Sequence, residues 1–201
     1  MDDVPVDSAL VISDLPVEIL CHIISFLTHK ELLLHVVPVC RLWRELAYDP
    51  VNWQMLSFDL SNESITSETL QNCFARCHLL HSLEIIGGRY SRFSVSVADI
   101  RCCALHCNKV TDLQLRFISN LDTKMVAEVV QNFPQLKNFN VEGCEHLDDS
   151  CILSICELSS LCKLNIAHCT QIMDKALDII SCHLPLLQYL NIDGLNHISD
   201  R

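Results

Sequence analysis

The residues of this 201-residue chain most able to bind a metal or act in catalysis are its 13 cysteines and 10 histidines. They are densest in two stretches, where they could bind zinc or form a thiol–imidazole pair: Cys73, Cys77, His78, Cys102, Cys103, His106 and Cys107. No two cysteines are separated by two residues, so the C-x-x-C spacing of common zinc sites is absent. With so many of both residue types, chance Cys–His neighbours are expected. The sequence therefore predicts no catalytic residue, no metal site and no cofactor.

Nucleotide and nucleic-acid chemistry are also disfavoured. The chain has only four glycines, and they form neither a GxGxxG nor a GxxxxGK[ST] phosphate-binding loop. The formal net charge is −11, and no run of Lys or Arg could neutralise a phosphate backbone. We therefore expect a folded chain that acts without a nucleotide and has no nucleic-acid partner.

The cysteine content indicates a reducing compartment. The first twelve residues contain acidic residues and no basic one, unlike a secretory signal, so the thiols are expected to stay reduced. The longest apolar run, near residues 32–40, is interrupted by His35 and Pro38 and is too short for a membrane span. We expect a soluble protein of the cytosol or the nucleus, with no membrane partner.

Most of the chain repeats one apolar pattern. The frame apolar-x-x-apolar-x-apolar, usually followed three residues later by a small, thiol or apolar residue, recurs six times. The copies start 25 to 30 residues apart, at Trp53, Leu80, Val110, Leu136, Leu161 and Leu187. A unit of this length cannot bury its own apolar surface, so the repetition predicts a stacked array.

Each copy divides into an expected strand and an expected helix. The alternating L-x-L part predicts a short strand with one buried face, and apolar residues at helical spacing follow it, as at Val126, Val129 and Val130. A small buried residue such as Cys144 or Cys169 should occupy the turn after the strand. Several acidic residues precede the helical stretches, where they could cap a helix: Asp148, Asp149, Asp174 and Asp200.

Residues 13–52 predict a separate module of three short helices. Pro16 suits the first turn of a helix because it needs no hydrogen-bond partner there. Thr28 and Glu31 form the T-x-x-E pattern that opens a second helix, which should end before Pro38. The middle helix is apolar on nearly all sides. Part of its surface must therefore face another body, either the repeats or a partner protein.

The order of residues in this module resembles an F-box. The segments LPVEIL (15–20), VCRLWREL (39–46) and the DPxxW pattern at 49–53 stand at that family's spacing. The repeats resemble leucine-rich repeats of the cysteine-containing kind, most closely in the last three copies. Together these resemblances imply an α/β chain with a short three-helix F-box and a strand–helix solenoid of about six repeats that is open at its C-terminal end. The implied domains are an N-terminal tail at 1–12, the F-box at 13–52 and the repeats at 53–201.

Two sets of binding residues follow from these resemblances. An F-box docks on the SKP-type adaptor of a cullin ubiquitin ligase, which implies the contacts Leu15, Pro16, Ile19, Leu20, Ile23, Val39 and Trp43. The repeats would hold a protein substrate through polar strand positions on the concave face: Glu84, Gln114, Arg116, Asn138, Asn140, Glu142, Lys163, Asn165, Tyr189 and Asn191. Tyr189, Arg116 and Lys163 are the strongest candidates, since aromatic side chains and arginine often anchor interfaces. The asparagines could equally be residues that merely tolerate exposure.

We therefore expect a non-catalytic substrate-recognition subunit of an SKP–cullin–F-box ubiquitin ligase. Two alternatives remain at this point. One is an interaction scaffold in which the front helices only cap the solenoid, and the other is a zinc- or thiol-dependent enzyme. The sequence stops at Arg201, where the helix of the last repeat should begin. We accordingly expect either a shorter form of a longer array or a partner that covers the last strand.

Overall fold

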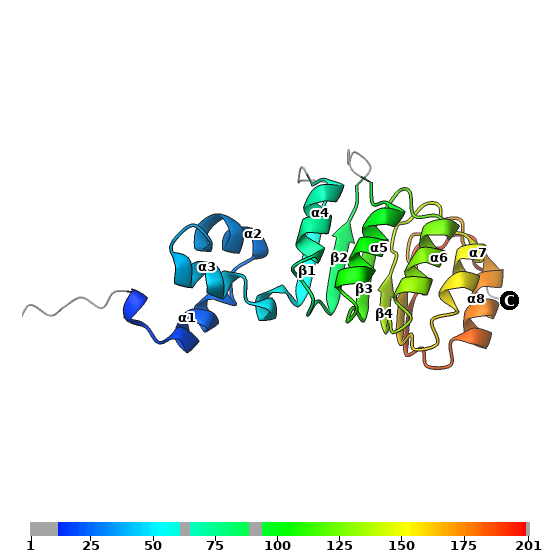
Figure 1. The fold of residues 1–201 in the computed structure, drawn as a ribbon. Helices are drawn as coiled ribbons and strands as arrows, with labels where there is room; N and C mark the ends of the chain where they lie inside the picture. The colour runs from blue at the N-terminus through cyan, green and yellow to red at the C-terminus, as the bar shows by residue number, and fades with distance from the viewer. Residues whose placement is uncertain (1–11, 61–64, 89–93, 200–201) are drawn as a thin grey trace, which may run out of the picture. The chain divides into compact units, whose positions relative to one another are not determined.

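The computed structural model describes residues 12–60, 65–88 and 94–199 (Figure 1). The chain forms two compact units, Met1–Asn52 and Trp53–Arg201. Each unit has its own hydrophobic core. The expected N-terminal tail lies outside the described residues except for Ile12.

The first unit is built from short helical segments. Its elements are η1 (Ile12–Asp14), α1 (Val17–Ile24), α2 (His29–Glu31), the π-helical turn η2 (Leu32–Val36), α3 (Arg41–Ala47) and η3 (Pro50–Trp53), whose last residue belongs to the second unit. The capping box at Thr28 and Glu31 is confirmed, with each side chain accepting the other's backbone N–H. The second helix also ends before Pro38, as predicted, but through a π turn in which the Val37 N–H donates to the Leu32 carbonyl.

The core of this unit is small. Six buried side chains form it, namely Leu20, Ile24, Leu32, Val36, Leu46 and Ala47. Leu15 and Trp43 pack against it while remaining partly exposed. A core of this size cannot cover all the apolar side chains of three short helices, so several of them stay at the surface.

The second unit confirms the predicted solenoid. Six parallel strands lie in sequence order in one sheet: β1 (Met55–Asp59), β2 (Ser82–Ile86), β3 (Asp112–Arg116), β4 (Asn138–Asn140), β5 (Lys163–Asn165) and β6 (Tyr189–Asn191). The helices between them cover one side of the sheet (Figure 1): α4 (Ser67–Phe74), α5 (Val97–His106), α6 (Thr123–Asn132), α7 (Asp149–Ile155) and α8 (Asp174–His183). Within the described ranges, no helix is long and apolar enough to cross a bilayer.

The strand register aligns equivalent residues of the repeats. Leu83, Leu113, Phe139 and Leu164 are successive partners across the sheet, and all four are buried. The turn after the strand holds a buried thiol, as predicted for Cys144 and Cys169. The Cys144 thiol donates to the carbonyl of Leu115, 3.1 Å away in the preceding strand, and Cys169 does the same to Val141 at 3.2 Å. The thiols therefore fill space and also join neighbouring repeats.

The predicted acidic caps are only partly correct. Asp148 caps α7 by accepting from the N–H groups of Ser150 and Cys151. Asp174 is instead the first residue of α8, because Met173 occupies the capping position. Its carboxylate accepts from the N–H and hydroxyl of Ser199 in the next repeat, at 2.7 Å each.

Asp149 behaves in the same way as Asp174. It lies inside α7, and its carboxylate accepts the Met173 N–H at 2.9 Å. An acidic residue in the first turn of each of these two helices thus links one repeat to the next. Asp200 lies outside the described residues.

Candidate protein-binding surfaces

The first helix exposes an apolar surface. Ile19 and Ile23 lie one turn apart on α1, and Phe26 follows the helix with 74% of its area exposed. These residues lie at helical spacing and face solvent, because Leu20 and Ile24 fill the core from the other side of the helix. Exposed apolar groups at helical spacing are typical of a surface that binds another protein.

The predicted adaptor contacts differ in their exposure to solvent. Pro16, Ile19, Ile23 and Val39 are exposed, whereas Leu15 and Trp43 are partly buried. The structure does not support Leu20 as a direct contact, because only 1% of its area is exposed and it belongs to the core. It supports the surface from within and is not available for direct contact.

Other exposed apolar residues of this unit were not among the predicted contacts. They include Val17, Phe26, Leu33, Leu34 and Leu42. The apolar character of the middle helix signalled that some of its side chains would be exposed, but the sequence did not distinguish which ones. Only the packing of Leu32 and Val36 into the core identifies Leu33 and Leu34 as surface residues.

In the repeat unit, polar residues occupy the sheet face that the helices leave open. We call the register-aligned set Ser57, Glu84, Gln114, Asn140, Asn165 and Asn191 the central row. All of these except Ser57 are partly buried. The structure thus brings the predicted substrate-binding residues onto one face, including those on either side of this row.

Part of this face is already occupied by internal ion pairs. Arg116 lies between Glu84 and Glu142, with nitrogen–oxygen distances of 3.5 and 3.2 Å. Ser57 donates to the Glu84 carboxylate at 2.7 Å. Arg116 was predicted to be a strong contact residue, yet a partner would have to compete with two carboxylates for it.

The asparagines of the central row have a structural role. The side-chain oxygens of Asn140, Asn165 and Asn191 each accept the backbone N–H two residues later, at 3.0 Å. This local bond closes the turn at the end of each strand. Their amides also reach neighbouring repeats, as from Asn165 to Glu142 at 3.5 Å. The asparagines are therefore held in place independently of any partner.

The part of the face near β5 is more open. A hollow of about 310 Å³ is lined by side chains that include Asn138, Asn140, Lys163, Asn165 and Tyr189. Lys163 and Tyr189 are exposed, and no described carboxylate lies within ion-pair distance of the Lys163 ammonium. These two side chains are the most available of the predicted substrate contacts.

A known protein family matches the part of the chain that contains the exposed apolar surface of α1. Residues 12–59 match the F-box-like family. The chain carries an F-box-like domain. The exposed Ile19, Ile23 and Phe26 all lie within this domain.

Solved structures resemble the repeats that follow the F-box-like domain. The leucine-rich repeat-containing protein LegL7 from Legionella pneumophila matches 86% of this chain and is covered over 54% of its own length, with 14% identity and a TM-score of 0.54. A TLR13 complex with the RNA ssRNA13 matches 75% of this chain and is covered over 21% of its own, with 16% identity and a TM-score of 0.50. The chain thus spans about half of the first protein and a fifth of the second. These likenesses show that the repeats have the leucine-rich repeat fold.

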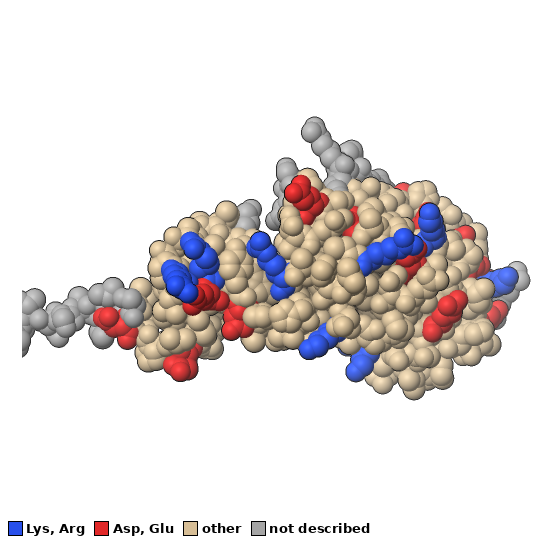
Figure 2. All heavy atoms as spheres, in the orientation of Figure 1, with Lys and Arg blue, Asp and Glu red and all other residues tan. Residues whose placement is uncertain are grey.

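Charges on the helical face of the repeats are mixed. Lys and Arg side chains alternate with Asp and Glu over the visible surface and do not gather into a continuous patch (Figure 2). One such pair joins adjacent helices, since Arg101 on α5 donates to Glu128 on α6 through two nitrogens. This bond lowers the pKa of Glu128.

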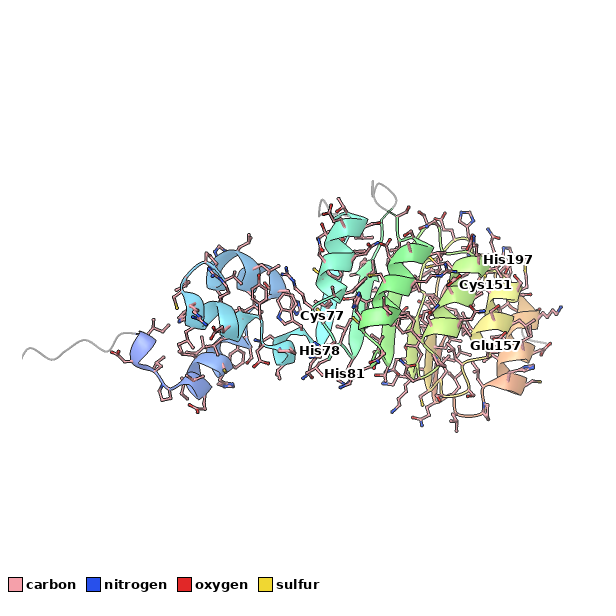
Figure 3. All side chains as sticks on the ribbon, in the orientation of Figure 1. Cys77, His78, His81, Cys151, Glu157 and His197 are labelled. Atoms are coloured by element: carbon pink, nitrogen blue, oxygen red, sulfur yellow. The ribbon has the colours of Figure 1, made fainter. Side chains whose placement is uncertain are left out.

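The thiols and imidazoles do not converge on one site. Cys77, His78 and His81 lie well apart from Cys151, Glu157 and His197 (Figure 3). In the described parts of the chain, no three His, Cys, Asp or Glu side chains are grouped so that they could hold a metal ion.

Most thiols of the repeats are poor nucleophiles. Burial raises the pKa of Cys77 to about 12 and that of Cys156 and Cys169 to about 11. Cys107 is the exception, because a hydrogen bond from the Cys103 thiol lowers its pKa. Cys107 is nevertheless fully buried.

The rate at which each cysteine of the native protein is alkylated should follow its exposure to solvent. With iodoacetamide at pH 8, we expect Cys40 and Cys182, which are exposed, to react at least about tenfold faster than Cys144 and Cys169. Peptide mass spectrometry after timed quenching measures each rate. The same digest after denaturation in guanidinium is the control, in which the four rates should converge. A fast native reaction at Cys144 would contradict its buried placement.

Proposed function

We propose that this chain is the substrate-recognition subunit of an SKP–cullin–F-box ubiquitin ligase and acts in the cytosol or the nucleus. The F-box-like domain would bind an SKP-type adaptor and, through it, a cullin. The repeats would bind a protein substrate. The observation that carries the proposal is the exposed apolar surface of α1, which lies inside the segment that matches the F-box-like family.

The proposed role requires no catalytic residue in this chain. Binding both the adaptor and the substrate raises the effective concentration of substrate lysines near the transferring enzyme, which by itself accelerates the reaction. The open sheet face supports this role, because Lys163 and Tyr189 are free to contact a partner while the ion pairs around Arg116 keep the face rigid.

Adaptor binding is tested by replacing two exposed apolar residues of α1 with acidic ones. Ile19→Glu combined with Ile23→Glu should abolish co-elution with a co-expressed SKP-type adaptor in size-exclusion chromatography. If both residues are hot spots at the centre of the interface, each contributes about 2 kcal/mol or more, so the affinity should fall at least a hundredfold. Isothermal titration calorimetry of the separately purified proteins measures the change.

The matched control places the same substitutions on the repeats. Leu105→Glu and Leu153→Glu change exposed leucines of α5 and α7, and they should leave co-elution intact. If folded wild-type chain does not bind the adaptor, the ligase proposal is wrong and the scaffold alternative stands. If the control variant loses binding equally, the contact is not specific to α1.

A further inference from the structure

Three carboxylates on the open sheet face, those of Glu84, Asp112 and Glu142, are already engaged within the chain. Glu84 and Glu142 both pair with Arg116, as described above. The two oxygens of Asp112 accept hydrogen bonds from the Thr111 hydroxyl, at 2.7 Å, and from the side-chain amide of its register partner on β4. A basic residue of a partner protein would therefore have to displace bonds that these carboxylates already make.

Lys163 differs from these acidic residues because its charge is not engaged. It is the first residue of β5 and is exposed. Among the described residues, its ammonium has neither a carboxylate within ion-pair distance nor a hydrogen-bond acceptor. Its register partners are both uncharged, Asn138 on β4 and Tyr189 on β6. The charge that this face leaves unused is therefore positive, although the net charge of the chain is −11.

The hollow beside Lys163 has more free hydrogen-bond donors than free acceptors. The side-chain oxygens of Gln114, Asn140 and Asn165, which line it, already accept bonds of 3.4, 3.0 and 3.0 Å. In contrast, the Lys163 ammonium, the Tyr189 hydroxyl and the Gln114 amide donate to no described residue. An ammonium has three donors and no acceptor. A surplus of donors fits a ligand that is rich in acceptor oxygens.

We propose that this hollow binds an acidic side chain of the protein substrate, with its carboxylate between the Lys163 ammonium and the Tyr189 hydroxyl. The inference rests on the proposed role of the repeats in substrate binding. Lys163 and Tyr189 are paired on neighbouring strands, which lie about 4.8 Å apart, so both can reach one carboxylate. The volume of the hollow, about 310 Å³, suits a side chain better than a large ligand.

A carboxylate matches the charge of the hollow better than a phosphate does. Lys163 supplies one positive charge, and a glutamate or aspartate side chain carries one negative charge. A phosphorylated side chain carries about −1.5 to −2 and would bring the excess toward Asp112, which also lines the hollow. Phosphate recognition usually depends on arginine clusters. On this face Arg116 is already shared between two glutamates.

The test is a titration of the isotopically labelled full chain followed by NMR. The probe is the peptide acetyl-Gly-Ser-Glu-Ser-Gly-amide, and its comparison has glutamine in place of glutamate. We expect shift changes centred on Lys163 and Tyr189. The glutamate peptide should bind at least about threefold tighter, because hydrogen bonds to an ionised group are stronger than neutral ones. High salt should reduce this difference by screening the charges.

Substitutions of Lys163 show whether its charge sets the preference. Lys163→Met keeps the length of the side chain and should remove the difference between the two peptides. Lys163→Glu should reverse it, in favour of a peptide with lysine in place of glutamate. Lys137→Met is the matched control, since Lys137 is an exposed lysine one residue before β4 that does not line the hollow. It should leave the preference for glutamate unchanged.

Four results would overturn the proposal. Two of them are equal affinity for the glutamate and glutamine peptides and a preference that survives Lys163→Met. The third is a glutamine peptide with a free carboxyl terminus that binds as tightly as the glutamate peptide, which would place a chain terminus in the hollow. The fourth is a phosphoserine peptide that binds more than tenfold tighter than the glutamate peptide, which would assign the hollow to a phosphate.

The titration requires no adaptor, so its outcome is separate from the co-elution test of the ligase proposal. A chain that binds the adaptor but does not prefer glutamate contradicts only the inference about the hollow. A chain that prefers glutamate but does not bind the adaptor contradicts only the ligase proposal.

Discussion

Replacing Phe139 by alanine is expected to lower the free energy of unfolding by about 3–5 kcal/mol, the range for a large buried aromatic side chain. Phe139 lies in β4 between Leu113 of β3 and Leu164 of β5, and all three are fully buried. In a solenoid each repeat is stabilised mainly by its neighbours. A cavity at this position therefore weakens two interfaces at once. Urea denaturation followed by circular dichroism measures the loss.

The matched control is Tyr189→Ala, which truncates an exposed aromatic residue in the last strand. Its expected cost is below about 1 kcal/mol, because little apolar area is removed from the core. Similar losses for the two variants would contradict the placement of Phe139 at the centre of the core. The urea midpoints of the two variants can be compared directly only if the slope of the free energy of unfolding against urea concentration is the same as in the wild type.

The strand–helix repeats could be predicted because their signals are local. Each copy carries its own apolar frame, and identical frames in successive copies also set the register, with Leu83 opposite Leu113. The asparagine turns are local too, since Asn140 bonds to the N–H of Glu142, only two residues away. Their structural role could have been inferred from the known preference of asparagine for such turns.

Features that depend on contacts between repeats could not be predicted. The engagement of Arg116 with Glu84 and Glu142 joins residues 32 and 26 positions apart. The placement of the Phe117 ring on Gly143 likewise requires the stacking of two turns. Neither is visible in the sequence of a single repeat.

The helical unit shows a different limit. The apolar residues of α1 surround much of the helix, so periodicity alone did not distinguish the core residue Leu20 from the exposed Ile19 and Ile23. The predicted capping role of Asp174 was wrong because the sequence pattern does not fix the exact start of a helix. The pattern of an acid before a helix was correct, but the helix begins one residue earlier than the pattern assumed.

Replacing Asp99 by alanine is expected to cost about 2–4 kcal/mol, more than the loss of an ordinary helix cap. Asp99 lies in α5 and is the buried charged residue among those described. Its carboxylate accepts from Ser67 and Gln71 on α4, at 3.1 and 3.0 Å, and from the backbone and hydroxyl of Ser96, at 2.9 and 2.7 Å. Alanine would leave these donors without their acceptor in a part of the molecule that water reaches poorly.

Asp122→Ala is the matched control, since its carboxylate caps α6 through one bond, to the Met125 N–H at 2.9 Å. The expected cost is about 1 kcal/mol. Asp99→Asn should fall between the two, because the amide keeps one acceptor and turns a donor toward the other donors. Thermal and urea denaturation of the three variants give the order. If Asp99→Ala costs no more than Asp122→Ala, the bonds from Ser67 and Gln71 add no stability. The contact between α4 and α5 would then rest on apolar packing alone, as at Leu70 and Ile100.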